Sequence, residues 1–374
     1  MSEPKGFAGK KFLPPDWNVA AQSVKRPSRK NCGTCHFFGG GGDGVKHGDL
    51  DSSLFEPAKE LDVHMSAEGA DFDCVRCHTT RAHFIAGRCY KQPAFTERKS
   101  LLDDDRIERI ACVSCHTSQP HEPGHKLNDH TDKVACQSCH IPAFARKNPT
   151  KMWWDWSQAG KRDEKGKPVV KMGEQGQPVY HGKKGEFRWE KTVVPEYFWF
   201  NGSLEYILLT DTIDPASRPI QLNQVQGDKD DPQSRIYPFK VHRGMMPYDT
   251  VNQTMLSPKL FGKTADAYWK GYDWNKALEA GMAAHGLDFS GSFDFIETAY
   301  HFPITHMVAP RENSLQCGQC HSRQSRLAAL SGFYMPGRNH NGILDTIGWL
   351  VILGSLAGVI LHGILRRFLG GSKQ

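Results

Sequence analysis

The sequence is short of apolar residues for its length. Only 39% of its 374 residues are hydrophobic, and they are accompanied by 36 glycines and 22 prolines. A chain of this length suggests two or three domains, whose aliphatic cores would be undersupplied. Disorder is disfavoured because 10% of the residues are aromatic. We therefore expect something other than aliphatic side chains to fill much of the interior.

The sequence also lacks a large excess of positive or negative charge. The formal net charge is +6, and the charged residues, 24% of the chain, are of both signs. Nucleic-acid-binding surfaces are strongly and locally basic, so we expect no nucleic-acid partner.

An apolar run suited to secretion is missing from residues 1–18, which are polar and contain prolines. We expect either that the gene starts before the printed sequence or that export depends on a feature outside it.

Cysteine, in contrast, is abundant and regular. Ten of the 11 cysteines form five Cys-x-x-Cys pairs, each followed directly by histidine. The motifs are Cys32-Gly-Thr-Cys35-His36, Cys74-Val-Arg-Cys77-His78, Cys112-Val-Ser-Cys115-His116, Cys136-Gln-Ser-Cys139-His140 and Cys317-Gly-Gln-Cys320-His321. Two thiols at this spacing can bond both vinyl groups of one haem, and the histidine then ligates its iron. Zinc ribbons and thioredoxin-like pairs also use Cys-x-x-Cys, but neither needs the histidine. The pattern predicts five covalently attached haem c groups.

The single long apolar run, residues 343–365, predicts a transmembrane helix. At about 1.5 Å per residue it can cross a hydrocarbon layer of about 30 Å once. Arg366, Arg367 and Lys373 follow it, which predicts a cytoplasmic C-terminus. Haem c is attached on the outer side of the bacterial inner membrane, so we expect the haem motifs on the periplasmic side and the membrane itself as a partner.

The spacing of the motifs suggests five segments. We expect an N-terminal extension (1–30), a four-haem module (31–145), a haem-free covering lobe (146–310), a fifth-haem segment (311–342) and a transmembrane anchor with a cytoplasmic tail (343–374). The expected fold is mainly α with extensive loops, organised around the haems, plus the membrane helix. Within the lobe, residues 265–285 form the most plausible helix.

Histidines outside the motifs are candidates for the second axial ligand of each iron. The candidates near the motifs are His47, His64, His83, His121, His125, His130, His301 and His306. A lone histidine is more often a surface or hydrogen-bonded residue, but a chain with five haems favours ligation, and we expect at least five to be ligands. The glycine run 39–44 formally fits the dinucleotide pattern G-x-G-x-x-G, yet it follows no apolar strand. It is better explained as a tight turn that delivers His47 to an iron.

Three blocks, residues 31–50, 134–146 and 304–310, resemble the octahaem tetrathionate reductase family of multihaem cytochromes c. The resemblance runs from about residue 15 to residue 340. By this resemblance, the sequence has five of the family's eight motifs, the C-terminal five, and adds the expected membrane helix. The family's catalytic haem, which has a lysine ligand, belongs to the N-terminal portion that this sequence does not contain.

The resemblance implies six distal ligands, because they lie in family-like contexts: His47, His64, His83, His121, His130 and His306. Six candidates for five haems suggest that one of them ligates a haem on another polypeptide. A further haem-carrying chain is therefore an expected partner.

Two functions compete. In the first, the chain is a membrane-anchored pentahaem carrier that exchanges electrons with a quinol-oxidising or cytochrome b-like membrane partner and a periplasmic redox partner. In the second, it is a multihaem reductase, or part of one, acting on tetrathionate, nitrite or hydroxylamine. Because this sequence does not contain the lysine-ligated module and has an expected membrane anchor, the electron-carrier function is favoured. The leftover Cys89 is expected to be a buried free thiol, the alternative being a thiol beside a haem.

Overall fold

The computed structural model describes residues 14–78 and 111–369, together with the backbone of four short strands within 5–12 and 80–85. The chain divides into two compact units, Met1–Ser314 and Leu315–Gln374, which are described separately below. His83 and Cys89 lie outside the described residues.

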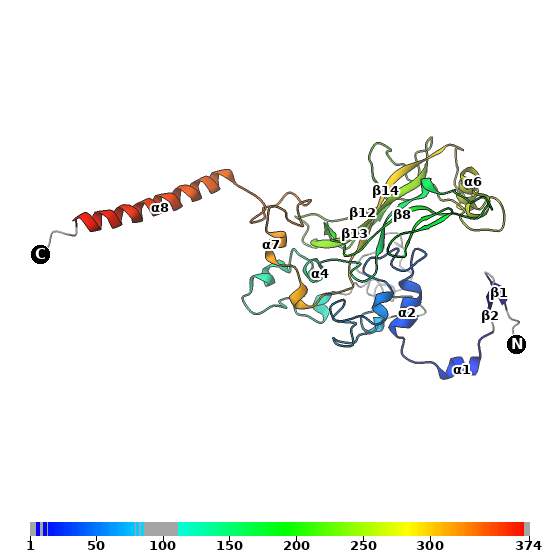
Figure 1. Cartoon of the computed structure of the whole chain (residues 1–374), viewed down its shortest axis with the longest axis horizontal. Coiled ribbons are helices and arrows are strands. Elements are labelled where there is room, and N and C mark those ends of the chain that lie inside the picture. The colour runs from blue at the N-terminus through cyan, green and yellow to red at the C-terminus, as the bar shows by residue number, and fades with distance from the viewer. Residues whose placement is uncertain are drawn as a thin grey trace. The chain divides into compact units, whose positions relative to one another are not determined.

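An eight-stranded sheet forms the centre of the first unit (Figure 1). Its strands are β5 (Thr150–Asp155), β6 (Val170–Met172), β7 (Pro178–His181), β8 (Gly185–Glu190), β9 (Glu196–Phe200), β11 (Ile220–Gln221), β13 (Arg235–Asp249) and β14 (Phe293–Pro303). They run in the order β11-β14-β13-β5-β8-β7-β6, and β9 pairs with β13 beside them. The prediction of a mainly α fold was therefore wrong: the chain is mixed α and β, and the sheet lies within the haem-free segment.

The physical reason for the sheet is that this segment has no haem to pack around and must bury its own side chains. In β8, Phe187 points inward while its neighbours Glu186 and Arg188 are exposed, the alternation that a half-buried strand requires. The central strand β13 is buried over most of its length and pairs antiparallel with β14, with Val241 opposite His301. This alternating pattern could have been read from the sequence.

Aromatic side chains supply much of the sheet's core. Phe200, Tyr237 and Phe239 are buried together, with ring centres 5.2–5.8 Å apart in edge-on contacts. Such contacts add to the free energy gained by burying the rings. In this lobe, aromatic rings therefore compensate for the shortage of aliphatic residues.

The predicted helix at 265–285 is two helices, α5 (Tyr268–Gly271) and α6 (Trp274–Ala284). Tyr272 has a positive φ of 57°, which breaks the helix, and the Asp273 side chain caps the new start by accepting the Lys276 N–H at 3.2 Å. Through Leu278 and Met282, α6 packs in a cluster that includes Phe293 at the start of β14.

Around the first four motifs, the described residues form short helices and loops, together with the short strands β3 (Thr80–Arg81) and β4 (Phe84–Ile85). The helices are α2 (Arg29–His36), the 3₁₀ helices η1 (Ser52–Phe55), η2 (Cys74–Arg76), η3 (Cys112–Ser114) and η4 (Lys126–His130), and α4 (Cys136–His140). The remaining elements of this unit are β1 (Lys5–Phe7), β2 (Lys10–Phe12), α1 (Trp17–Gln22), η5 (Trp156–Gln158), β10 (Leu204–Tyr206), β12 (Asn223–Val225) and η6 (Arg311–Asn313).

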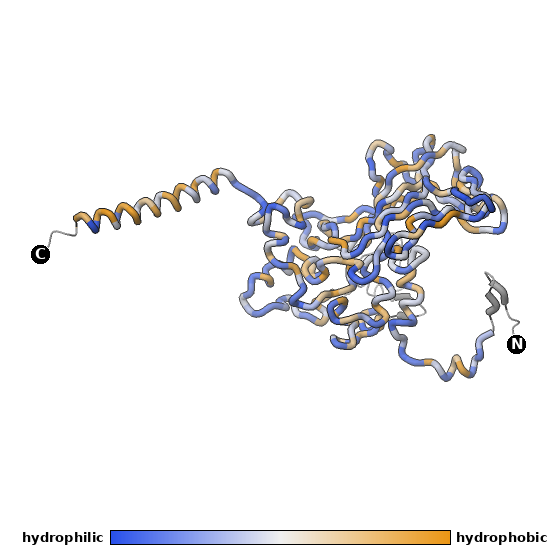
Figure 2. Tube along the Cα trace, in the orientation of Figure 1, coloured by the Kyte–Doolittle hydropathy of each residue, from blue (hydrophilic) through white to orange (hydrophobic). Residues whose placement is uncertain are grey.

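The second unit holds α7 (Cys317–Cys320) and the long helix α8 (Gly342–Leu369). Helix α8 has 28 residues and contains an 18-residue stretch with a mean hydropathy of 2.0, and none of its side chains is buried. Figure 2 shows the apolar colour along its length. At about 1.5 Å per residue it is longer than the hydrocarbon layer is thick. Within the described residues it is the one helix long and apolar enough to cross a membrane.

Candidate haem-binding site

The Cys-x-x-Cys-His motifs form single helical turns. In three of them the histidine N–H donates to the carbonyl of the first cysteine, at 2.9 Å in His78 and His116 and at 2.8 Å in His321. A turn of this kind places the two thiols, three residues apart, on one side of the backbone. All ten motif cysteines are free of disulfides, so both thiols of each motif are available for thioether bonds.

Three motif histidines each face a second histidine from a distant part of the chain. The ring centres are 6.1 Å apart for His64 and His116, 6.3 Å for His78 and His306, and 6.5 Å for His121 and His140. Three of the six predicted distal ligands are thus brought opposite a motif histidine.

These separations are the ones that an iron atom requires. Bonds from histidine nitrogen to a metal are about 2 Å long, and an imidazole nitrogen lies about 1.1 Å from its ring centre because ring bonds are about 1.3 Å long. Two imidazoles on opposite sides of one metal therefore have centres about 6.2 Å apart. Together with the free thiols, this spacing shows that the residues present fit covalently attached haem with two histidine ligands.

His125 is a neighbour of His121 as well, with ring centres 6.1 Å apart. Its Nδ1, however, accepts the backbone N–H of Leu127 at 3.1 Å and so caps η4. His140 follows directly on a cysteine pair, and burial lowers its pKa, which favours the neutral imidazole that binds metals. Of the two, His121 is therefore the better placed to pair with His140.

A buried carboxylate orients His306. Asp49 is 1% exposed, and its Oδ2 accepts the backbone N–H groups of Thr305 and His306 at 2.7 and 2.9 Å and lies 3.2 Å from His306 Nδ1. Burial favours the neutral acid, but the hydrogen bond and charge of His306 outweigh it and lower the pKa of Asp49. The ionised Asp49 holds the proton on Nδ1 and leaves Nε2 for a metal.

A second carboxylate bonds the two segments that carry the predicted distal ligands His64 and His306. Asp62, also 1% exposed, accepts the N–H of His64 at 2.9 Å through Oδ1 and the N–H of Met307 at 2.9 Å through Oδ2. Arg146 donates to the carbonyls of Leu61 and Met307. Met307 has φ of 63°, a conformation that costs energy for a residue with a side chain. These bonds hold it there.

Cysteines of successive motifs lie close to one another among the first four motifs. Burial and the neighbouring thiol Cys32 raise the pKa of Cys74. The same holds for Cys77 beside Cys115, where burial is again the larger cause. Cys112 hydrogen-bonds with Cys136, which raises its pKa. Each motif therefore has a cysteine close to a cysteine of the next motif, so haems attached to successive motifs would be neighbours.

A backbone carbonyl group orients the histidine of the fifth motif. His321 Nδ1 lies 3.1 Å from the carbonyl oxygen of Pro336, so Nδ1 carries the proton and Nε2 is directed elsewhere. The predicted distal ligand His130 has the same arrangement, with Nδ1 3.2 Å from the carbonyl of Lys126.

The described ring contacts pair three of the six predicted ligands with motif histidines, and His47, His83 and His130 are not among these three. His47 is half-buried with its ring edge-on to Phe302, 5.3 Å between centres, and faces no other imidazole within 14–78 and 111–369. Burial and nearby lysines lower its pKa to about 4 despite the charge of Asp49. His83 lies outside the described residues, so its assignment stays a prediction.

The supporting residues Asp49, Asp62 and Arg146 were not predicted. Asp49 lies in the block 31–50 and Arg146 ends the block 134–146, the segments that carried the family resemblance. A polar residue close to candidate ligands in such blocks is the signal that could have found them.

Comparison with known proteins gives three matches. A family described as bacterial cytochrome c matches residues 151–324, that is, the sheet and the fifth motif. A crystal structure of an octaheme cytochrome c from Shewanella oneidensis is 40% identical, with a TM-score of 0.76, over 90% of this chain and 73% of that chain. An uncharacterized protein from Archaeoglobus fulgidus is 37% identical over 71 residues, which are 18% of this chain and 23% of that protein. The chain thus aligns with less than a quarter of the archaeal protein.

Replacing Asp49 by asparagine tests its role toward His306. The variant Asp49→Asn removes the negative charge that makes the imidazole a stronger electron donor, so the ferric state loses stabilisation. In a spectroscopic redox titration of the haem-loaded protein, we expect one midpoint potential to rise while the others stay. The control Asp51→Asn changes a buried carboxylate that hydrogen-bonds Ser53 and Asn148 instead. Equal shifts in both variants would contradict the assignment.

Proposed function

The chain belongs to the octahaem cytochrome c family, as its motifs predicted, and on that premise we propose that it carries electrons between a membrane partner and a periplasmic redox partner. It is a multihaem cytochrome with covalently bound haem c and a redox role. The proposed membrane partner is a quinol-oxidising or cytochrome b-like protein.

The observation that supports the proposal is that motif histidines lie opposite other histidines, in motifs whose cysteines are close to one another. Three motif histidines, His78, His116 and His140, already face a second histidine. An iron with two protein ligands has no position for a substrate, whereas it can still gain and lose electrons. Neighbouring haems of this kind support electron transfer from one haem to the next rather than catalysis.

The membrane part of the proposal rests on α8. Its length and hydropathy suit a single span, and Arg366 and Arg367 in its last turn favour a cytoplasmic C-terminus by the positive-inside rule. The haem motifs would then lie on the periplasmic side of a bacterial inner membrane.

The count of haems in the proposal is five, one for each motif. His47 is then the surplus ligand, because it faces no imidazole in the described part of the chain and its lowered pKa keeps it neutral. We propose that His47 is directed to a haem carried by another polypeptide. This supports a second haem-carrying chain as a partner.

Reoxidation kinetics separate a carrier from a reductase. The haem-loaded protein is reduced without oxygen and mixed in turn with tetrathionate, nitrite, hydroxylamine and soluble ferricytochrome c, and haem absorbance is followed by stopped flow. We expect ferricytochrome c to reoxidise the haems and the three small substrates to act no faster than buffer. Fast, saturable reoxidation by any of the three would establish the reductase instead.

Truncation tests the anchor. A variant that ends at residue 341 should move from the membrane fraction to the soluble periplasmic fraction, because it loses the apolar surface of α8, and its haem spectrum should not change. A matched control replaces residues 343–365 by an equal number of leucines and should stay in the membrane. Protease added to intact spheroplasts should digest the haem part of the full chain. A truncated protein that still sediments with membranes would refute the anchor.

A further inference from the structure

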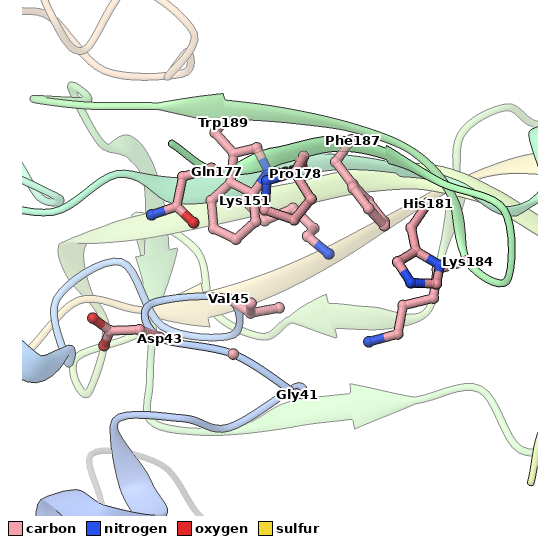
Figure 3. Close-up of a pocket in the computed structure, with 11 residues that line it drawn as sticks. Gly41, Asp43, Val45, Lys151, Gln177, Pro178, His181, Lys184, Phe187 and Trp189 are labelled. Carbon is pink, nitrogen blue, oxygen red and sulfur yellow. Dashed lines mark hydrogen bonds between the residues drawn. The ribbon is translucent and has the colours of Figure 1, made fainter. Parts of the chain in front are cut away.

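A small pocket lies beside the glycine loop that follows the first haem motif. It has a volume of about 120 Å³ and is bounded by Gly41 of that loop, Lys151 of β5, His181 of β7, Lys184 of the following turn, and Phe187 and Trp189 of β8 (Figure 3). Since a water molecule occupies about 30 Å³ in the liquid, the pocket has room for a few waters or one small polyatomic ion. The axial histidine pairs leave this pocket unused.

Lys151 brings an unpaired positive charge to the pocket. The residue is 4% exposed, and its Nζ lies 3.8 Å from the ring centre of Trp154 and 3.6 Å from that of Phe187. Within the described residues no carboxylate or hydrogen-bond acceptor contacts this ammonium. Aromatic faces compensate only part of the lost hydration of a buried cation. Burial and the charge of Lys184 accordingly lower the pKa of Lys151 to about 7.

Two further donors face the same space. Figure 3 shows the Lys184 side chain reaching the gap between the sheet and the glycine loop, where Lys151 also ends. Lys184 has no ion-pair partner in the described part of the chain, its nearest ring being Trp269 at 5.6 Å. His181 Nδ1 accepts the N–H of Lys183 at 3.1 Å, so its own proton is on Nε2. Burial and the nearby lysines lower the pKa of His181.

The one acidic residue of the pocket is turned away. Asp43 accepts the N–H of Ser52 at 2.8 Å and the Nδ2 of Asn148 at 3.4 Å. Figure 3 shows its carboxylate directed away from the two lysines. The charge inside the pocket is therefore positive and uncompensated.

We propose that this pocket binds an oxyanion group, held by Lys151 and Lys184 with the His181 N–H as a further donor. The group is either a small inorganic oxyanion or the carboxylate of a haem attached at the adjacent first motif. Both have oxygen acceptors that would satisfy the unpaired donors and restore the charge balance. The inference does not depend on the direction of electron transfer through the chain.

Calorimetry on the haem-loaded protein tests the inorganic source. Sodium sulfate, phosphate and thiosulfate are titrated at an ionic strength fixed with chloride. One anion is expected to bind per chain, and Lys184→Gln should weaken binding about tenfold or more, since it removes a charge-assisted hydrogen bond. Lys171→Gln, the same change at an exposed position of β6, should have no effect. Binding should tighten as the pH falls through about 7, because Lys151 gains its proton there.

Redox titration tests the haem carboxylate. If no anion binds, Lys184→Gln should lower one midpoint potential and Lys171→Gln should not, because the loss of a cation near a haem disfavours the ferrous state. Lys151→Met should act in the same direction, and its thermal unfolding is measured alongside because the residue is buried. Lys184 lies at the half-buried edge, so its variant keeps the test independent of folding. The proposal would be overturned if no anion bound to the protein and if Lys184→Gln also caused no shift in a midpoint potential.

Discussion

The site depends on one buried carboxylate that joins two segments far apart in the sequence. Asp62 accepts backbone N–H groups from His64 with one oxygen and from Met307 with the other, both at 2.9 Å. Charge-assisted hydrogen bonds are strong inside a protein, and leaving one end unpaired would cost the desolvation of a charge. The segments that carry the predicted distal ligands His64 and His306 are therefore held together by the same interaction, and Met307 is held at positive φ by it.

The sheet positions one of the two segments that Asp62 joins. Strand β14 ends at Pro303, and the chain then runs directly into the haem-motif region. Ile304 donates to the carbonyl of Pro238 in β13 at 3.0 Å, and Ala309 donates to the carbonyl of His140 at 2.8 Å. The long antiparallel pairing of β13 with β14 fixes where Pro303 lies, and so it fixes where His306 enters the module. The lobe with the sheet thus acts as the scaffold that positions His306.

Local chemistry was readable from the sequence, whereas the architecture was not. The five Cys-x-x-Cys-His motifs and the long apolar helix follow from residue types and their spacing, and the family follows from the resemblance of three sequence blocks. Among the distal ligands, His64, His121 and His306 were predicted and do face motif histidines. Their pairing could not be predicted, because His306 reaches His78 across 228 residues through the register of the sheet. The sheet could not be predicted from the haem motifs, which lie outside it, and its sequence signal is the alternation of buried Phe187 with exposed Glu186 and Arg188.

The most direct test of this account is the spin state of the haems, measured by low-temperature electron paramagnetic resonance of the oxidised, haem-loaded chain. The account predicts low-spin signals from histidine-paired irons in the wild type. In the His306→Ala variant, one haem should become high-spin, because the iron held by His78 loses its second ligand. An unchanged spectrum in His306→Ala, or a full high-spin haem per chain in the wild type, would contradict it.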